Sequence, residues 1–146
     1  MTGKTFLDEA AEFAYKELER TGGNPAKLEI PLHAVALIDH AQAIIDNGGF
    51  QYLFENDLPF SPPYQLLVDA YRRIGAVGAA AHIEKAVSMF PFTEPHLHQV
   101  ERDSFMGSLQ ETHEFFQLGD NVCGDTTVWT ALEDNARKNG GMFRIM

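Results

Sequence analysis

The chain has 146 residues, a formal net charge of −10 and a hydrophobic fraction of 45%. That apolar fraction excludes an intrinsically disordered chain, and the length fits a single domain over residues 1–146. The negative charge argues against direct binding of nucleic acid or of an anionic membrane surface.

The sequence predicts a cytoplasmic protein. No apolar run reaches the roughly eighteen residues of a membrane span, and the first residues lack the apolar core of a signal peptide. Cys123 is the only cysteine, so no internal disulfide can form, as is usual in a reducing compartment.

Two helices are predicted in the first third of the chain. Apolar residues recur at helical spacing from Phe6 to Leu18, with Thr5 as the expected N-cap and a stop at Gly22. The stretch from Leu32 to Asn47 is apolar over most of its circumference, which predicts the central, buried helix of the fold. Gly48 is its expected left-handed C-cap.

Polar and aromatic residues of this region have simple expected roles. Asp39 and Asp46 either cap a neighbouring helix or occupy the one hydrated stripe of the central helix, and the second interpretation is favoured. A cluster of aromatic residues follows, and we expect it to fill the core rather than to form a partner pocket. Its members are Phe50, Tyr52, Phe54, Phe60 and Tyr64.

The middle of the chain predicts a pair of helices. Ser61-Pro62 reads as an N-cap followed by the first helical position, and the helix should end at Gly75. An Ala-rich helix is expected from Val77 to Phe90, where small residues permit close packing.

The apolar spacing over residues Leu97 to Leu118 predicts one long helix, or two helices joined at Gly107. Asp103, Glu111 and Glu114 then lie on one face of it. The opposite, apolar face would contain Leu97, Phe105, Leu109 and Phe116.

The C-terminal part predicts one more helix after a loop over residues 119–125. Thr126 or Thr127 is the expected N-cap, and Asn139-Gly140-Gly141 is the expected end. Together these patterns predict a single, compact, all-α domain of about six or seven helices around the Leu32–Asn47 helix.

The six histidines and the cysteine form no recognisable metal or catalytic motif. His96 and His98 stand two residues apart, so on a helix they point apart, and His33 and His40 have no adjacent ligand set. Acidic residues around Cys123 disfavour its thiolate and make it a poor nucleophile. We therefore expect no catalytic residue, no metal and no cofactor.

Acidic residues form long blocks. Nine acidic residues lie between Ala86 and Ala136 with Arg102 as the only Lys or Arg, and six lie between Leu28 and Tyr71 with none. Blocks of one sign can steer a positively charged partner, although many acidic proteins carry such charge only for solubility.

The segment Asn47-Gly48-Gly49-Phe50, followed by aromatic residues and Asn56, resembles the bacterial DNA-mimic protein family, in a domain long catalogued as one of unknown function. Ile74-Gly75-Ala76 before an Ala-rich helix fits the same family, and the similarity covers roughly residues 32–118. Two departures are Ile44, where members often have Glu, and extra residues between the Arg102 region and the last helix.

The resemblance implies an all-helical, non-enzymatic, acidic binding protein that imitates DNA and sequesters a basic partner such as a DNA-binding transcriptional regulator. The carboxylates expected to contact it are Asp103, Glu111, Glu114, Asp120 and Asp125. An immunity-type protein that neutralises a toxin is an alternative, as is a small enzyme or metal protein. A homodimer is an open alternative for its assembly.

Overall fold

Helices account for all regular structure in residues 5–24 and 27–143, which the computed structural model describes. In chain order the elements are α1 (Phe6–Arg20), α2 (Ile30–Glu55), α3 (Tyr64–Arg73), α4 (Val77–Ser88), the 3-10 turn η2 (Pro95–Leu97), α5 (Gln99–Gly107), α6 (Glu114–Asp120), α7 (Thr126–Lys138) and α8 (Gly140–Phe143). The described residues contain no strand, so the all-α prediction is confirmed.

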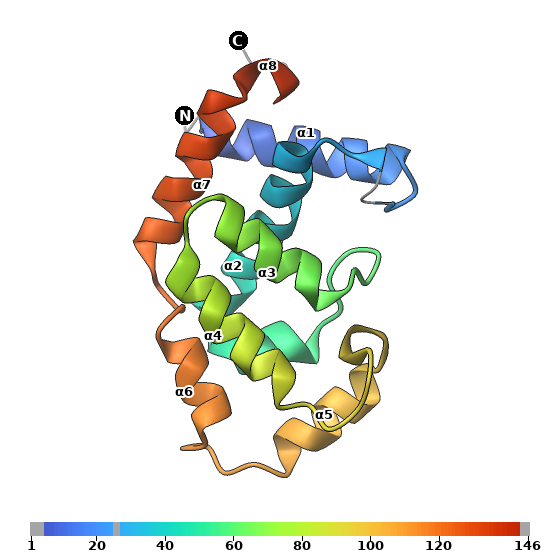
Figure 1. Ribbon diagram of the computed structural model, residues 1–146, viewed down its shortest axis with the longest axis vertical. Helices are drawn as coiled ribbons and strands as arrows, with labels where there is room; N and C mark the ends of the chain where they lie inside the picture. The colour runs from blue at the N-terminus through green and yellow to red at the C-terminus, as the bar shows by residue number, and fades with distance from the viewer. Residues whose placement is uncertain (1–4, 25–26, 144–146) are drawn as a thin grey trace.

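Helix α2 is the centre of the fold, as its apolar circumference predicts. It contacts α1, α3, α5, α6 and α7. Val35, Ile38, Ala41 and Ile45 in its first half have no exposed surface. Figure 1 shows α2 running behind α3 and α4, with α1 across one end and α6 and α7 along one side. A helix enclosed by others must be apolar on every side, because each face is withdrawn from water.

Helix α2 breaks at the Asn-Gly-Gly motif and starts again at once. Gly48 has φ −161° and Gly49 has φ +65°, and helical geometry resumes with Phe50. The expected C-cap at Gly48 is therefore wrong in detail, because Gly49 is the residue with positive φ. Phe50 and Phe54 point into the core and are 1% and 0% exposed.

We expect Gly49→Ala to lower the free energy of unfolding by about 1–2 kcal/mol, because a Cβ is strained at this backbone conformation. No atom lies within 4 Å of the Cβ position of Gly49, so the loss of stability would report backbone strain alone, without a steric clash. Gly78→Ala in α4 is the control, since its Cβ would also meet no atom within 4 Å but its φ is not positive. Chemical denaturation that shows equal losses for the two variants would contradict this assignment.

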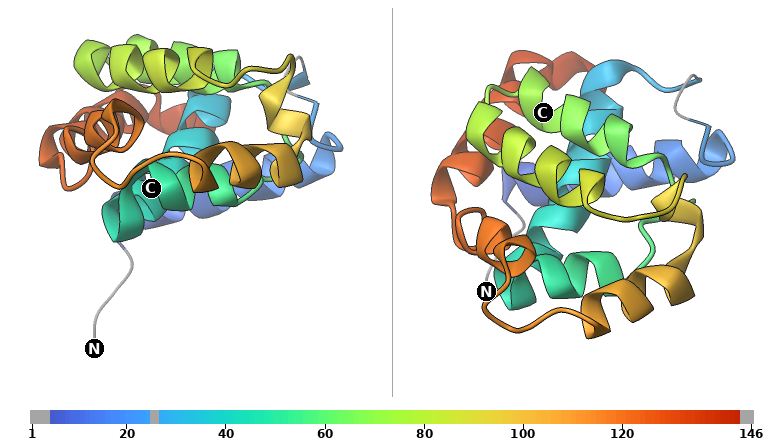
Figure 2. Two further views of the ribbon diagram at one scale, coloured as in Figure 1. Left: turned by 90° about the horizontal axis from the view of Figure 1, so that it is seen from below. Right: turned by 60° about the horizontal axis from the view of Figure 1, so that its bottom comes forward.

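Helices α3 and α4 pack against each other and form one layer, and the second half of α2 and α5 lie in another layer, as Figure 2 shows. Helix α3 begins at Tyr64 with Pro63 as N-cap, so the expected start at Ser61-Pro62 is wrong. Ser61 has φ +45°, which places it in a turn before the helix. Gly75, with φ +87°, ends the helix as predicted.

The stretch predicted as one long helix, or as two helices joined at Gly107, is broken more widely. Helix α5 ends at Gly107, and α6 begins only at Glu114 after an irregular connection over residues 108–113. Leu97 lies on η2 and is 55% exposed, so it is not part of an apolar face. The break lets α6 turn back and pack on both α2 and α4.

Aromatic side chains fill the core between α2, α4 and α6. The Phe54 ring lies 5.3 Å from that of Phe90 and 5.5 Å from that of Phe115, measured between centroids. Core filling is thus confirmed for Phe50, Phe54 and Tyr64, which are buried. It is wrong for Tyr52 and Phe60, which are 48% and 53% exposed.

Asp46 organises the loop before α7 and does not line a hydrated stripe. Its Oδ1 accepts hydrogen bonds from Gly124 N and Gln42 Nε2, both at 2.8 Å, and its Oδ2 accepts one from Trp129 Nε1 at 2.8 Å. Asp39 accepts a hydrogen bond from the Tyr15 hydroxyl at 3.3 Å. Neither expected role fits Asp46, because Asp125 is the N-cap of α7 and Asp46 instead holds the loop before α7 against α2.

The two outer helices differ in how well sequence predicted their ends. Thr5 caps α1 as predicted, and it forms a capping box with Asp8. Asp125 caps α7 through Thr127 N at 3.0 Å, so neither threonine is the N-cap. Helix α7 ends at Lys138 with Asn139 as its C-cap, as predicted, and the chain then enters the short helix α8 at Gly140.

Candidate functional site

A groove of about 710 Å³ lies between the second half of α2, the end of α5, the 108–113 connection and α6. We call it the acidic groove. Its lining includes four carboxylate residues, four large apolar residues and the Gly48-Gly49 break. The carboxylates are Glu55, Asp103, Glu111 and Asp120, and the apolar residues are Phe50, Met106, Leu109 and Phe116.

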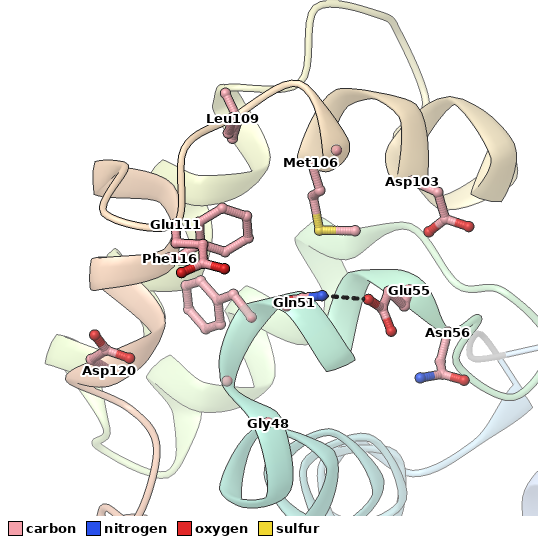
Figure 3. A pocket seen from close by; sticks show the side chains of 13 residues that line it. Gly48, Gln51, Glu55, Asn56, Asp103, Met106, Leu109, Glu111, Phe116 and Asp120 are labelled. Atoms are coloured by element: carbon pink, nitrogen blue, oxygen red, sulfur yellow. Dashed lines mark hydrogen bonds between the residues drawn. The ribbon is translucent and has the colours of Figure 1, made fainter.

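The four carboxylates lie at two ends of the acidic groove. Figure 3 shows Asp103 and Glu55 at one end, and Glu111 and Asp120 at the other. Met106 projects from α5 between the two ends. The arrangement places two separated patches of negative charge around an apolar centre.

Little within the chain compensates these charges. Glu55 accepts a hydrogen bond from Gln51 Nε2 at 2.9 Å, as drawn in Figure 3. Asp103, Glu111 and Asp120 are exposed and form no ion pair or side-chain hydrogen bond with any described residue. Within the described part of the chain, no lysine or arginine lines the groove.

Arg102, next to Asp103 in sequence, is turned completely into the protein and has no exposed surface. Its Nε donates to Phe54 O at 2.8 Å, its Nη1 to Pro95 O at 2.7 Å, and its Nη2 to Asp57 Oδ1 at 2.7 Å. Residues 86–136 therefore carry seven exposed and two half-buried acidic side chains, and no exposed lysine or arginine. The charge count of the sequence includes Arg102, so its burial leaves the exposed part of this segment more acidic than the composition suggests.

A model of the DMP19-like protein family matches residues 26–139. The chain belongs to this family. No curated protein and no solved structure matches it significantly. In this DMP19-like chain the matched region begins after α1 and includes every residue that lines the acidic groove. No helix in the described ranges is both long and apolar enough to cross a bilayer.

The structure brings three of the five carboxylates expected to bind a partner into one groove and places two elsewhere. Asp103, Glu111 and Asp120 line the acidic groove of the DMP19-like fold. Glu114 forms an ion pair with Lys85 of α4, and this ammonium group lowers the pKa of the Glu114 carboxyl. Asp125 is half-buried and caps α7. The expectation of one helical face for Asp103, Glu111 and Glu114 is wrong, because Glu111 lies in the connection and Glu114 starts a different helix.

Glu55 is the groove carboxylate that sequence reasoning did not single out. It belongs to the acidic block before Tyr71, but it follows the Asn-Gly-Gly break, which was assigned a purely structural role. Helical spacing from Phe50 places Gln51 and Glu55 on one face, four residues apart, and the buried Phe50 and Phe54 on another. This helical spacing could have identified Glu55 from the sequence.

The described residues contain no group of three or more histidine, cysteine or acidic side chains arranged to hold a metal ion. His96 lies on η2, and His98 is the N-cap residue of α5. Cys123 is an exposed free thiol, and its sulfur contacts Asp46 O at 3.6 Å.

Proposed function

We propose that this DMP19-like chain is a non-enzymatic, acidic binding protein that sequesters a basic protein, and that this partner is a DNA-binding regulator. The observation that carries the proposal is the segment of residues 86–136, which has nine acidic side chains, seven of them exposed, and no exposed lysine or arginine. A surface of one sign attracts an oppositely charged partner over distance and repels nucleic acid.

This segment differs from α1, α3 and α4 in having no exposed base of its own. Several carboxylates of the first helix and of α4 are paired locally, as in Lys16–Glu12, Arg20–Glu17 and Arg72–Glu84. Membership of the DMP19-like family is consistent with the resemblance to DNA-mimic proteins on which the proposal draws. A protein that binds DNA presents a positive surface, and an acidic surface without cations is its electrostatic complement.

Affinity capture with this chain from native lysate is expected to retain a DNA-binding protein at low salt and to lose it at high salt. The reason is that the Debye length falls from roughly 10 Å at 0.1 M to about 3 Å at 1 M salt. The captured protein is then mixed with its DNA duplex in a gel-shift assay, in which the chain should release the duplex. A partner that binds DNA and the chain simultaneously would contradict the proposal, and a captured toxin would favour the immunity role.

A further inference from the structure

We propose that the acidic groove binds a short basic segment of the partner, in which one large apolar side chain lies between two arginine or lysine side chains. The inference rests on the proposed function and adds to it the surface that is used and the chemistry of the segment that it recognises.

The first step is the separation of the charges. Asp103 and Glu55 form one end of the groove, and Glu111 and Asp120 form the other. One compact cation could not contact both ends, and the described carboxylates do not form a metal site. Two cationic side chains of one extended or helical segment can contact both ends at once, because side chains of a peptide are spaced along its backbone.

The second step is the absence of internal partners. Some acidic residues elsewhere in this chain form ion pairs with its own bases, as Glu114 does with Lys85 and Glu133 with Arg137. Asp103, Glu111 and Asp120 have no such pair among the described residues. An incoming guanidinium or ammonium group therefore displaces no internal ion pair, and only water must leave.

The third step is the apolar centre. Met106 is buried at the base of the groove, and Leu109 and Phe116 are half-buried beside it. A purely ionic ligand makes no use of these side chains, whereas an apolar side chain between two bases would bury surface against them. Thioether and aromatic side chains adapt to partners of varied shape, which suits a docking groove.

A second copy of this chain fits the groove less well than a separate basic partner. Arg72 on α3 and Lys85 on α4 are already held in ion pairs with Glu84 and Glu114. A homodimer through these bases would have to break those pairs first. We therefore assign the groove to the partner.

The test measures fluorescence anisotropy of a labelled peptide in which arginines alternate with leucines. The triple variant Asp103→Asn, Glu111→Gln, Asp120→Asn should weaken binding about tenfold, since exposed ion pairs contribute about 0.2–1 kcal/mol each. The matched control removes three exposed charges outside the groove, with Glu9→Gln, Glu19→Gln and Asp134→Asn, and should change affinity by less than about threefold. An equal loss in both variants would show that only overall charge matters and would overturn the proposal.

A second variant fills the groove without changing its charge. Gly107 lines the groove at the end of α5, and a Cβ added there meets no atom within 4 Å. Gly107→Trp should therefore fold normally, as checked by circular dichroism and thermal melting, but should bind the peptide at least about tenfold more weakly. Unchanged binding by a folded Gly107→Trp variant would exclude the groove.

A peptide that replaces leucine with serine tests the apolar centre, and its binding should be weaker and more salt-sensitive than that of the leucine peptide. Equal binding of the two peptides would overturn the apolar part of the proposal. If the groove variants instead break a homodimer of the wild-type chain, a second copy is the occupant and the proposal fails.

The inference and the proposed function fail separately. If the groove variants still capture the native basic partner at wild-type affinity, the groove assignment falls and the sequestering role stands. If the wild-type chain binds the arginine–leucine peptide through the groove but captures no DNA-binding protein, the proposed function falls and the groove chemistry stands.

Discussion

Replacing Arg102 with methionine is expected to lower the free energy of unfolding by about 2–4 kcal/mol, because the carbonyl groups that its buried guanidinium satisfies lose their donor. The guanidinium donates to the carbonyl oxygens of Phe54, Pro95 and Asn56 and to the Asp57 carboxylate. Phe54 belongs to the last turn of α2, where carbonyls lack partners within the helix. Without Arg102 the buried Phe54 carbonyl and two part-buried carbonyls lose this donor, and the buried one has a desolvation cost.

The measurement is urea denaturation followed by far-UV circular dichroism, with two controls. Arg72→Met removes an exposed guanidinium paired with Glu84, so it should change the free energy of unfolding by less than about 1 kcal/mol. Asp57→Asn tests the ionic part alone. Because the Asp57 side chain is 46% exposed, water can take the place of its carboxylate. The free energy of unfolding should therefore fall less for Asp57→Asn than for Arg102→Met. A wild-type free energy for Arg102→Met would show that the buried guanidinium contributes no net stability.

Arg102 also explains how α5 is attached to α2. Gln99, one turn earlier on α5, donates its side-chain amide to Glu55 O, next to the carbonyl of Phe54. Two side chains of α5 thus satisfy the C-terminal carbonyls of α2, which has no basic residue in its own last turn. The same attachment fixes one wall of the acidic groove, because Asp103 and Met106 follow on α5.

Periodicity predicted the parts of the fold in which local pattern and tertiary burial agree. Apolar spacing located α1, α3 and α4, and the continuous apolar surface identified α2 as central. The turn glycine Gly75 has the positive φ expected of it. In each case the residue type has one dominant physical role, so sequence alone was sufficient.

The prediction was wrong where tertiary contacts outweigh local preference. The 108–113 connection continues an acceptable helical pattern, yet a straight helix there would keep Phe115 from the rings of Phe54 and Phe90, which lie 5.5 Å from it. Arg102 was counted as the one base of its acidic block and its burial was not predicted, because its partners include backbone carbonyls that no sequence pattern reveals.

The candidate site, like the fold, was predicted from the sequence only in part. Sequence singled out Asp103, Glu111 and Asp120 as acidic residues of interest, but grouped the first two by a helical face that does not exist. What places them together is the turn between α5 and α6, together with the return of α6 to α2. Their role in binding a partner stays a prediction that the peptide experiment tests.

Gly119→Ala is expected to lower the free energy of unfolding by about 2–3 kcal/mol through overpacking. Gly119 lies on the face of α6 that packs against the helix restart after Gly49. An added Cβ would stand 2.7 Å from Phe50 N and 2.8 Å from Phe50 Cγ. The backbone nitrogen cannot turn aside as a flexible side chain could, so α6 must move away from α2. Thermal and urea denaturation measure the loss.

Gly78→Ala is the matched control, because Gly78 lies in α4 and its Cβ would meet nothing within 4 Å. Alanine has the higher helix propensity, so this variant should gain up to about 1 kcal/mol. A loss of stability in Gly119→Ala and a gain in Gly78→Ala would separate the cost of overpacking from the effect of helix propensity. Displacement of α6 would also move Phe116 and Asp120 at the groove wall, so Gly119→Ala should weaken binding of the arginine–leucine peptide although no groove carboxylate is changed. A Gly119→Ala variant as stable as Gly78→Ala would mean that α6 does not depend on close contact with Phe50, and the link between the Asn-Gly-Gly break and the acidic groove would be lost.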